Sequence, residues 1–297
     1  MKALIFGANG YIGMHIAMQA QKENWDVSLF DVQETGQNWF ANYQCVDVRK
    51  KESIEVINTN VDFIFFFSGL TGTLNAYEQY ENFIDVNEKG LLHLLQHMRN
   101  QKSKARIIFP STRLVYKGKK DMPLAENSEK ECKTIYALNK FTCEHLLQQY
   151  SEYFGIQYTI FRICVPYGNE ISNNYSYGTI GFFLKKATAG NNISLYGSGE
   201  QRRTFTHISD LINAMFQVIS LPDSVNQIYN TGGENFSLKQ VAELIGQKYH
   251  IGIELAPWPP LEKLIESGDT IFDAGKIGKL TGKNLFTKKL QEWINHL

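Results

Sequence analysis

The chain has 297 residues and equal numbers of basic and acidic side chains, 30 Lys+Arg against 30 Asp+Glu, so its formal net charge is zero. This balance argues against bulk electrostatic binding to nucleic acid or to an anionic membrane surface. The length allows one large or two modest domains, and a hydrophobic content of 43% can fill a packed core. A wholly disordered chain is therefore excluded.

Cysteine usage and hydropathy indicate the compartment. The four cysteines are Cys45, Cys132, Cys143 and Cys164. Their spacing is wide and irregular, with no histidine at zinc-ligand intervals, so we expect no metal site and predict buried thiols in a reducing compartment. The apolar N-terminal stretch is too short for a secretion signal, and the apolar run at residues 63–67 is too short to cross a bilayer. We expect a soluble, cytoplasmic protein that does not bind membranes.

Strand-length apolar runs alternate with helical stretches through the first half of the chain. In order, we predict a strand at residues 3–6, a helix at 14–21, a strand at 27–30, a helix at 53–58, a strand at 63–67, a helix at 80–98, a strand at 106–109, a helix at 135–153 and a strand at 158–164. Continuous apolar strands separated by helices indicate a parallel sheet covered on both faces. The predicted fold class is α/β, a Rossmann-type doubly wound parallel sheet with a smaller, discontinuous C-terminal domain.

The pattern changes after Pro166. Residues 168–181 are rich in Asn, Ser, Tyr and Gly, as is typical of a loop over a site. A helix at 180–189, a strand at 193–195, a helix at 238–249 capped by Ser237 and a terminal helix near 288–296 are predicted. Residues 209–219 and 228–230 could return to the main sheet. We expect residues 1–165 and 204–232 to form the cofactor domain, and 166–203 and 233–297 the substrate domain.

A glycine-rich turn lies directly between the first predicted strand and the first helix. It reads Gly7-Ala8-Asn9-Gly10-Tyr11-Ile12-Gly13. Glycine at these points permits a tight turn, lets the backbone approach a pyrophosphate, and lets helix and strand pack closely. Because the strand-turn-helix context is present, the turn predicts a dinucleotide site that includes the backbone of Tyr11 and Ile12.

Two acidic positions at later strand ends extend this site. Asp31 ends the second strand, where a carboxylate can accept hydrogen bonds from both ribose hydroxyls and would repel a 2′-phosphate. No Arg follows within the next several residues, so NAD is favoured over NADP. A solvated strand-end Asp is the alternative. Asp47 and Val48 lie between the predicted strands at 27–30 and 63–67, after a further short strand, and could reach the adenine edge.

Three further residues form a candidate catalytic group. Thr112 follows the strand at 106–109, and Tyr136 and Lys140 share one helix face at i and i+4. Lowering a tyrosine pKa from about 10 to about 7 needs roughly 4 kcal/mol of differential stabilisation. A neighbouring ammonium together with an oxidised nicotinamide can supply this stabilisation, which would make Tyr136 a general base near neutral pH.

With these motifs in order, the sequence resembles the extended short-chain dehydrogenase/reductase superfamily, specifically its NAD-dependent nucleotide-sugar epimerase/dehydratase branch. The resemblance covers nearly the whole chain. Its other motifs are Ser68-Gly69, Val86-Asn87, Ser111-Thr112, Val115-Tyr116, Arg162, Tyr167-Gly168, Gly197-Ser198-Gly199, Arg203-Thr204-Phe205, Tyr229-Asn230-Thr231-Gly232-Gly233 and Asp273-Ala274-Gly275-Lys276.

The resemblance implies a role for each motif. Tyr136 would exchange a proton with the sugar C4 hydroxyl, Thr112 would hydrogen-bond the same oxygen, and Lys140 would hold the nicotinamide ribose. Phe67, Ser68, Gly69 and Asn87 are implied as further cofactor contacts. Arg203 would grip the diphosphate of the substrate, with a surface ion pair as the alternative, and the loop at 167–181 would close over the sugar. Thr71, Tyr167 and Asp269 are further implied substrate contacts.

Several positions depart from the family pattern. Arg113 and Leu114 stand where 4,6-dehydratases carry an acidic pair, so dehydration is not expected. Val165 replaces the usual Asn before Tyr-Gly, which removes one hydrogen bond to the diphosphate. Glu266 replaces the Arg that many 4-epimerases carry three residues before the Asp of a Gly-Asp pair. An acidic group there would repel a diphosphate.

Three functions therefore stay open. The leading hypothesis is a redox-neutral nucleotide-sugar 4-epimerase that keeps NAD bound, and the second is a reductase of nucleotide 4-keto-6-deoxy sugars. The third is a non-catalytic NAD-binding sensor on the same fold. Many relatives dimerise through a four-helix bundle, which would here use the helices at 80–98 and 135–153.

Overall fold

The computed structural model describes residues 1–172, 175 and 177–297, and it divides the chain into two compact units. Unit 1 comprises Met1–Val115, Cys132–Arg162 and Ile219–Tyr229, and unit 2 comprises Tyr116–Glu131, Ile163–Val218 and Asn230–Leu297. Residues 116–131, 163–165, 204–218 and 230–232, which the sequence interpretation placed with the cofactor domain, thus fall in unit 2. Assignment of cofactor and substrate to separate domains stays a prediction.

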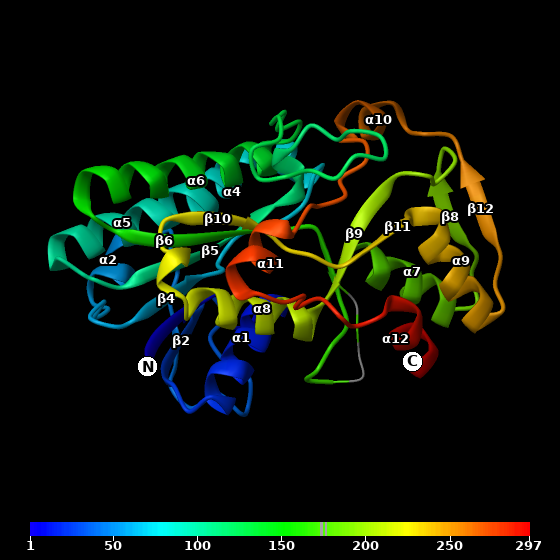
Figure 1. The fold of residues 1–297 in the computed structure, drawn as a ribbon. Coiled ribbons are helices and arrows are strands. Elements are labelled where there is room, and N and C mark those ends of the chain that lie inside the picture. The colour runs from blue at the N-terminus through cyan, green and yellow to red at the C-terminus, as the bar shows by residue number, and fades with distance from the viewer. Residues whose placement is uncertain (173–174, 176) are drawn as a thin grey trace. The chain divides into compact units, whose positions relative to one another are not determined.

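Unit 1 is built on a seven-stranded sheet (Figure 1). Its strands are β1 (Lys2–Phe6), β2 (Asp26–Asp31), β3 (Tyr43–Cys45), β4 (Phe63–Phe66), β5 (Arg106–Thr112), β6 (Gln157–Ile163) and β10 (Gln227–Asn230). The spatial order is β10-β6-β5-β4-β1-β2-β3, and the pairs β1–β2, β2–β3, β1–β4 and β4–β5 are parallel. The chain therefore proceeds outward from β1 in one direction and from β4 in the other, which places a topological switch point between β1 and β4.

Helices cover both faces of this sheet, as a doubly wound fold requires. They are α1 (Tyr11–Lys22), α2 (Lys51–Glu55), α3 (Asn75–Glu78), α4 (Tyr80–Ile84), α5 (Gly90–Gln101) and α6 (Ile135–Phe154). One apolar cluster joins Phe6, Phe66 and Phe109 of the sheet to Leu94 of α5 and Leu147 of α6. Figure 1 shows α1 on the opposite face of the sheet from α5 and α6. The predicted strands and the α/β fold class are confirmed.

The helix predicted at residues 80–98 is not one regular helix. A π-helical segment, Asp85–Lys89, separates α4 from α5. A Cβ on Gly90 would lie 2.8 Å from Val48 Cγ2, so the helix comes close to the segment that follows β3. Single π-helical turns inserted into α-helices occur frequently at functional sites.

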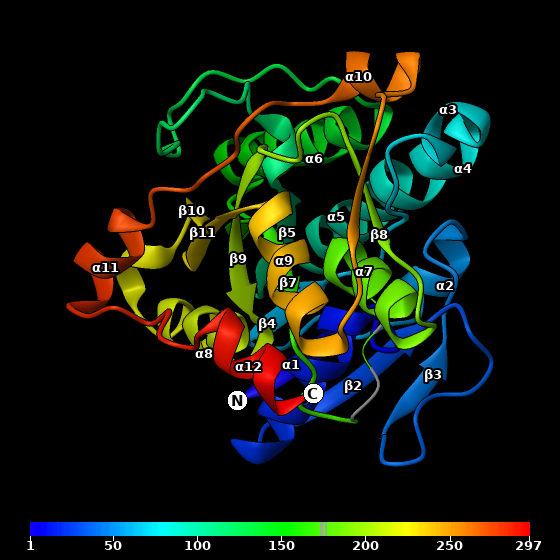
Figure 2. The ribbon, with the colours of Figure 1, turned by 90° about the vertical axis from the view of Figure 1, so that its right-hand side faces the viewer.

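Unit 2 contains two small sheets, of order β11-β9-β7 and β12-β8, and several helices that Figure 2 shows from a second side. The strands are β7 (Val165–Tyr167), β8 (Ile193–Tyr196), β9 (Arg202–His207), β11 (Glu234–Ser237) and β12 (Ile253–Ala256). The helices are α7 (Gly178–Thr188), α8 (Ile208–Ile219), α9 (Leu238–Tyr249), α10 (Pro260–Ile265), α11 (Gly275–Thr281) and α12 (Leu290–His296), whereas short 3₁₀ turns at Arg113–Val115 and Pro222–Ser224 belong to unit 1. Ser237 caps α9 with a capping box, as predicted.

Three sequence expectations concern this later half and the surface. The suggestion that residues 209–219 return to the sheet is wrong, because they form α8, whereas 228–230 do join it as part of β10.

The four cysteines are free thiols, but Cys45 is exposed and Cys164 half-buried, so the expectation of buried thiols holds only for Cys132 and Cys143. The predicted loop at 167–181 includes residues 173, 174 and 176, which lie outside the described part of the chain.

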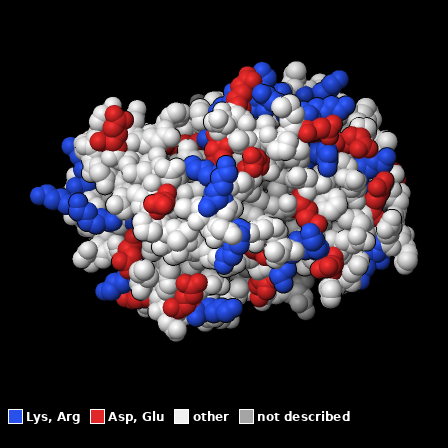
Figure 3. All heavy atoms as spheres, in the orientation of Figure 1, with Lys and Arg blue, Asp and Glu red and all other residues white. Residues whose placement is uncertain are grey.

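Charge and hydropathy agree with the composition. On the face in Figure 3, basic and acidic side chains are interspersed and neither sign forms a continuous patch. No helix among the described residues is long and apolar enough to span a bilayer.

Candidate functional site

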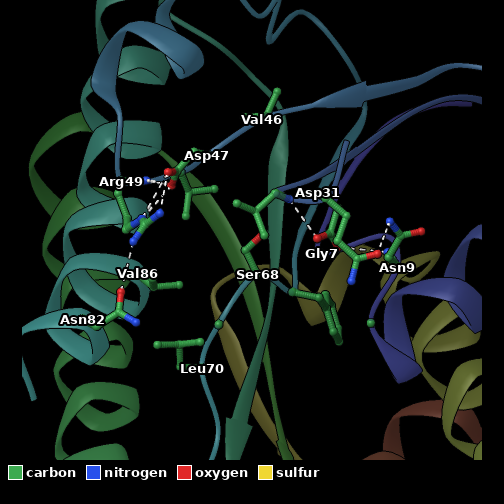
Figure 4. A pocket seen from close by; sticks show the side chains of 16 residues that line it. Gly7, Asn9, Asp31, Val46, Asp47, Arg49, Ser68, Leu70, Asn82 and Val86 are labelled. Carbon is green, nitrogen blue, oxygen red and sulfur yellow. Dashed lines mark hydrogen bonds and ion pairs between the residues drawn. The ribbon is translucent and has the colours of Figure 1, made fainter. Parts of the chain in front are cut away.

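A cavity of about 380 Å³ opens at the switch point of the unit 1 sheet (Figure 4). Its lining combines residues that follow β1, β2, β3 and β4 with two residues of the helical segment at 80–89. Eight predicted cofactor residues line it: Gly7, Gly10, Asp31, Asp47, Val48, Phe67, Ser68 and Gly69. The carboxyl ends of strands at a switch point are where open α/β sheets bind their ligands.

The three turn glycines are required for different reasons. Gly7 has φ +79°, and a Cβ there would lie 2.6 Å from the Phe67 carbonyl carbon, so turn and strand end are in contact. A Cβ on Gly13 would lie 2.0 Å from the Gly7 oxygen, which leaves no room for any side chain. A Cβ on Gly10 would meet only that oxygen, at 3.1 Å. Internal packing thus explains Gly7 and Gly13, whereas Gly10 leaves open space beside the cavity.

The start of α1 fits an anionic ligand. Gly10 is the N-cap residue and no side chain caps the helix, while Tyr11 and Ile12 begin it half-buried. The first backbone N–H groups of an uncapped helix have no intrahelical acceptor and carry partial positive charge. A pyrophosphate beside Gly10 would supply the missing acceptors.

Asp31 is held with its carboxylate toward the turn. The Asn9 N–H donates to Asp31 Oδ2 at 3.0 Å, and the Val32 N–H donates to Oδ1 at 2.8 Å. The Asn9 side-chain oxygen is buried and has no hydrogen-bond partner within the described chain. The lining therefore contains a fixed carboxylate, which is suited to the hydroxyl donors of a nucleoside.

An arginine that the sequence interpretation missed fixes Asp47. Arg49 donates from Nε to Asp47 Oδ1 at 2.9 Å and from Nη2 to Oδ2 at 2.7 Å, while its Nη1 donates to Asn82 Oδ1 at 3.2 Å. These bonds lower the pKa of Asp47. Figure 4 shows this group on one side of the cavity and Asp31 with Asn9 on the other. The signal that could have found Arg49 is its i+2 spacing from Asp47, where a local side-chain pair is possible.

Asn87 organises the strand end opposite the turn. Its Oδ1 accepts from the Leu70 N–H at 2.7 Å and its Nδ2 donates to the Leu70 oxygen at 3.1 Å. Asn87 belongs to the π-helical segment and is 2% exposed. Its observed role is therefore to hold the chain after Gly69, and its predicted contact with the cofactor stays a prediction.

Lys140 brings a cation to the same strand end. Its side chain is buried on α6, with Nζ 4.5 Å from the centre of the Phe109 ring. A methyl group on Gly69 would lie 3.6 Å from this Nζ, which places the ammonium beside the cavity lining. Burial lowers the pKa of Lys140 to about 8, against the opposing effect of Cys143 and Glu144. Within the described chain its ammonium forms no hydrogen bond or ion pair.

The helix face that carries Lys140 is turned toward β5. Tyr136, Lys140 and Glu144 are spaced at i, i+4 and i+8 and so share that face. Glu144 accepts from the Ser111 hydroxyl and forms a buried ion pair with Arg162, whose Nη2 lies 2.6 Å from Oε2. Because Ser111 precedes Thr112, this contact aligns the end of β5 with α6.

Thr112 and Tyr136 are the other two residues of the predicted catalytic group. Thr112 is the last residue of β5, and its Oγ1 accepts from the Leu114 N–H at 3.3 Å. Tyr136 is half-buried in the first turn of α6, which Thr134 caps. The sequence interpretation missed Glu144, although continuing the helical period from Tyr136 and Lys140 would have found it.

The predicted substrate residues are placed differently. Thr71 is exposed after β4 of unit 1, and the other three lie in unit 2. Tyr167 is fully buried, with ring contacts to His207 and Trp293, so it offers no surface to a ligand. Asp269 uses both carboxylate oxygens on backbone donors, the N–H groups of Arg202 and Asp121. Their substrate roles stay predictions.

Arg203 differs most from its predicted role. Its side chain is buried, and its Nη2 donates to Glu266 Oε1 at 2.5 Å. Its Nη1 donates to the backbone oxygens of Arg202 and Gly268. The alternative of an ion pair is what the structure contains, but the pair is largely buried rather than on the surface. The Arg203 guanidinium is therefore not exposed for binding an anionic ligand.

The glycine turn and the cavity at the switch point are typical of a dinucleotide-binding α/β unit. Residues 3–232 match the NAD dependent epimerase/dehydratase family. The chain belongs to this family, whose members are NAD-dependent enzymes of nucleotide-sugar metabolism.

Known proteins of several activities are similar to the chain. It is 28% identical over 282 residues to UDP-N-acetyl-alpha-D-glucosaminuronate decarboxylase of Bacillus cytotoxicus, covering 90% of this chain and 86% of the relative. It is 24% identical over 299 residues to CDP-paratose 2-epimerase of Salmonella typhi, with 88% of each chain covered. The structure of UDP-glucose 4-epimerase of Thermus thermophilus in complex with NAD superposes with a TM-score of 0.86 at 22% identity, covering 99% and 97% of the two chains. The structural likeness shows the fold, whereas the family rests on the match of residues 3–232.

Proposed function

We propose that the chain is a nucleotide-sugar 4-epimerase that keeps its NAD bound and oxidises and re-reduces the sugar at C4. The observation that carries this proposal is the buried ammonium of Lys140, which lies beside Gly69 of the cavity and on one helix face with Tyr136. A buried cation with no carboxylate at bonding distance costs stability, so its retention suits a functional role.

The residues of the cavity fit NAD by their chemistry. The start of α1 and Gly10 would receive the pyrophosphate, Asp31 the adenosine ribose hydroxyls, and Asp47 with Val48 the adenine edge. Lys140 would donate to the nicotinamide ribose. Bound NAD supplies a hydride acceptor and donor at its nicotinamide ring.

Proton transfer is assigned to Tyr136. The Lys140 ammonium, with its pKa of about 8, stays mostly protonated at pH 7 and stabilises a phenolate on the same helix face. Tyr136 would take the proton of the sugar C4 hydroxyl and later return it, and Thr112 would hydrogen-bond the same oxygen. Arg113 and Leu114 offer no acid and base for elimination of water, which supports an outcome without dehydration.

The test removes only the phenolic oxygen. Tyr136→Phe should lower kcat for interconversion of UDP-hexoses by about 10²- to 10⁴-fold, as expected for loss of a general base, while the NAD content of the purified protein is unchanged. Tyr153→Phe is the matched control, because Tyr153 is on the same helix and 67% exposed. Unchanged turnover in Tyr136→Phe would remove Tyr136 from this role.

A second function is favoured by one observation, the neutralisation of Arg203 by Glu266, which weakens the expected grip on a diphosphate. In this reading the protein is a reductase that makes one hydride transfer to a nucleotide 4-keto-6-deoxy sugar and exchanges its cofactor. Purified protein that lacks NAD but consumes NADH with a 4-keto sugar nucleotide would establish the reductase and refute the epimerase. A sensor without turnover would show neither activity.

We further propose a cytoplasmic homodimer. Tyr80 of α4 and Leu138 of α6 are exposed apolar side chains on the two segments that the predicted four-helix bundle would use. Four free thiols agree with a reducing compartment. The molar mass in solution decides whether the dimer forms.

A further inference from the structure

The ion pair between Arg203 and Glu266 changes what unit 2 can offer to a ligand. The Arg203 side chain is 2% exposed and that of Glu266 is 22% exposed. Glu266 is therefore the member of the pair that meets solvent. An approaching anion encounters a carboxylate at this point before it encounters the guanidinium.

The surrounding backbone fixes this arrangement. Glu266 Oε1 also accepts from the Gly268 N–H at 3.0 Å, and Arg203 Nη1 donates to the Gly268 oxygen at 2.5 Å. The Thr270 N–H donates to the Arg202 oxygen at 3.0 Å. The segment 266–270 is thus attached to β9 in two ways, by hydrogen bonds of the Arg203 side chain and by a backbone hydrogen bond to Arg202.

We infer that Glu266 is a specificity-determining residue. Its carboxylate neutralises the positive charge of Arg203, so that phosphate groups do not bind beside this ion pair. Neutral hydrogen-bond donors of the substrate bind there instead. Sugar hydroxyls or an amino group match an outward carboxylate, whereas a diphosphate is repelled by it. The inference rests on the proposed function, since it concerns which part of a nucleotide-activated sugar unit 2 contacts.

The test measures binding rather than turnover. Full-length protein saturated with NAD is titrated by calorimetry with UDP and with inorganic pyrophosphate at constant ionic strength, so that the cofactor cavity is already filled. Glu266→Gln keeps an oxygen that can accept from Arg203 and Gly268 but removes the negative charge. It should bind both probes at least tenfold more tightly than the wild type does, a change of about 1.4 kcal/mol.

Two control variants separate charge from contact. Glu266→Asp alters the contact but retains the charge, and it should show no gain in affinity. Glu254→Gln removes one exposed carboxylate from β12 of the same unit and should also show no gain. Melting temperatures of all variants establish that each is folded at the titration temperature.

The opposing outcomes are distinct. Equal affinity of wild type and Glu266→Gln for the probes, including no binding by either, would refute the inference, as would an equal gain in Glu266→Asp. Failure of the proposed function would instead appear as absence of turnover by the wild type, which these titrations do not measure.

Discussion

Replacing Lys140 by Met is expected to stabilise the cofactor-free protein while abolishing its activity. The Lys140 side chain is 5% exposed, and its pKa is lowered from 10.5 to about 8 by burial. A lowered pKa means that the folded protein disfavours the protonated form relative to the unfolded chain. At about 1.4 kcal/mol per pH unit, the charge costs about 3 kcal/mol when both states are protonated. Methionine has a similar length and carries no charge.

The lowered pKa of Lys140 also determines how the difference in unfolding free energy changes with pH. Below pH 8 Lys140 is protonated in the folded and unfolded states, so the full cost is present. Between pH 8 and 10.5 the folded protein releases the proton while the unfolded chain keeps it, and the cost falls as the pH rises. Lys140→Met should therefore exceed wild type in free energy of unfolding by up to about 3 kcal/mol at pH 7 and by about 1.4 kcal/mol at pH 9.5.

Urea denaturation of the cofactor-free proteins across this pH range measures the difference. Lys104→Met is the matched control, because Lys104 is exposed in unit 1, and its effect should stay within about 0.5 kcal/mol. A Lys140→Met protein that is less stable than wild type at pH 7, or a difference that grows with pH, would refute the argument from burial.

Two further predictions concern residues around the same cavity. Gly10→Ala should fold normally but bind NAD at least tenfold more weakly, whereas Gly13→Ala should also lower the free energy of unfolding by more than 1 kcal/mol, because its Cβ would lie 2.0 Å from the Gly7 oxygen. Calorimetry and urea denaturation check the pair, and equal stability of the two would contradict it. Glu144→Gln should cost about 3–5 kcal/mol in unfolding free energy, because it removes the negative charge that pairs with the buried Arg162 guanidinium. A loss below 1 kcal/mol would show that Arg162 finds another partner.

Local sequence patterns were sufficient for the parts of the cofactor cavity that depend on one strand end or one turn. Gly7 and Gly10 lie in the turn after β1 and Asp31 ends β2, and they line the cavity because strand ends of a parallel sheet meet at one edge. The helix containing Tyr136 and Lys140 was predictable from its period. These inferences needed only neighbours in the chain.

Features that depend on distant partners could not be predicted in this way. Asn87 lies in a π-helical segment, and the insertion of one wide turn does not change the apolar pattern enough to be recognised. The burial of Arg203 depends on Glu266, which is 63 positions later in the chain. The sequence showed that Glu266 departs from the family pattern, but only the structure shows that its carboxylate neutralises Arg203.

The Lys140 ammonium is left without Glu144 as a partner because a residue distant in the sequence, Arg162, binds Glu144. Lys140 and Glu144 are one helical turn apart, a spacing at which opposite charges usually pair. Here Arg162 of β6 contacts both oxygens of Glu144, and the Ser111 hydroxyl donates to Oε1 as well. The carboxylate is thereby satisfied from the sheet, and the ammonium is left toward Gly69 and the cavity. The buried pair thus engages the carboxylate that would otherwise be the natural partner of Lys140.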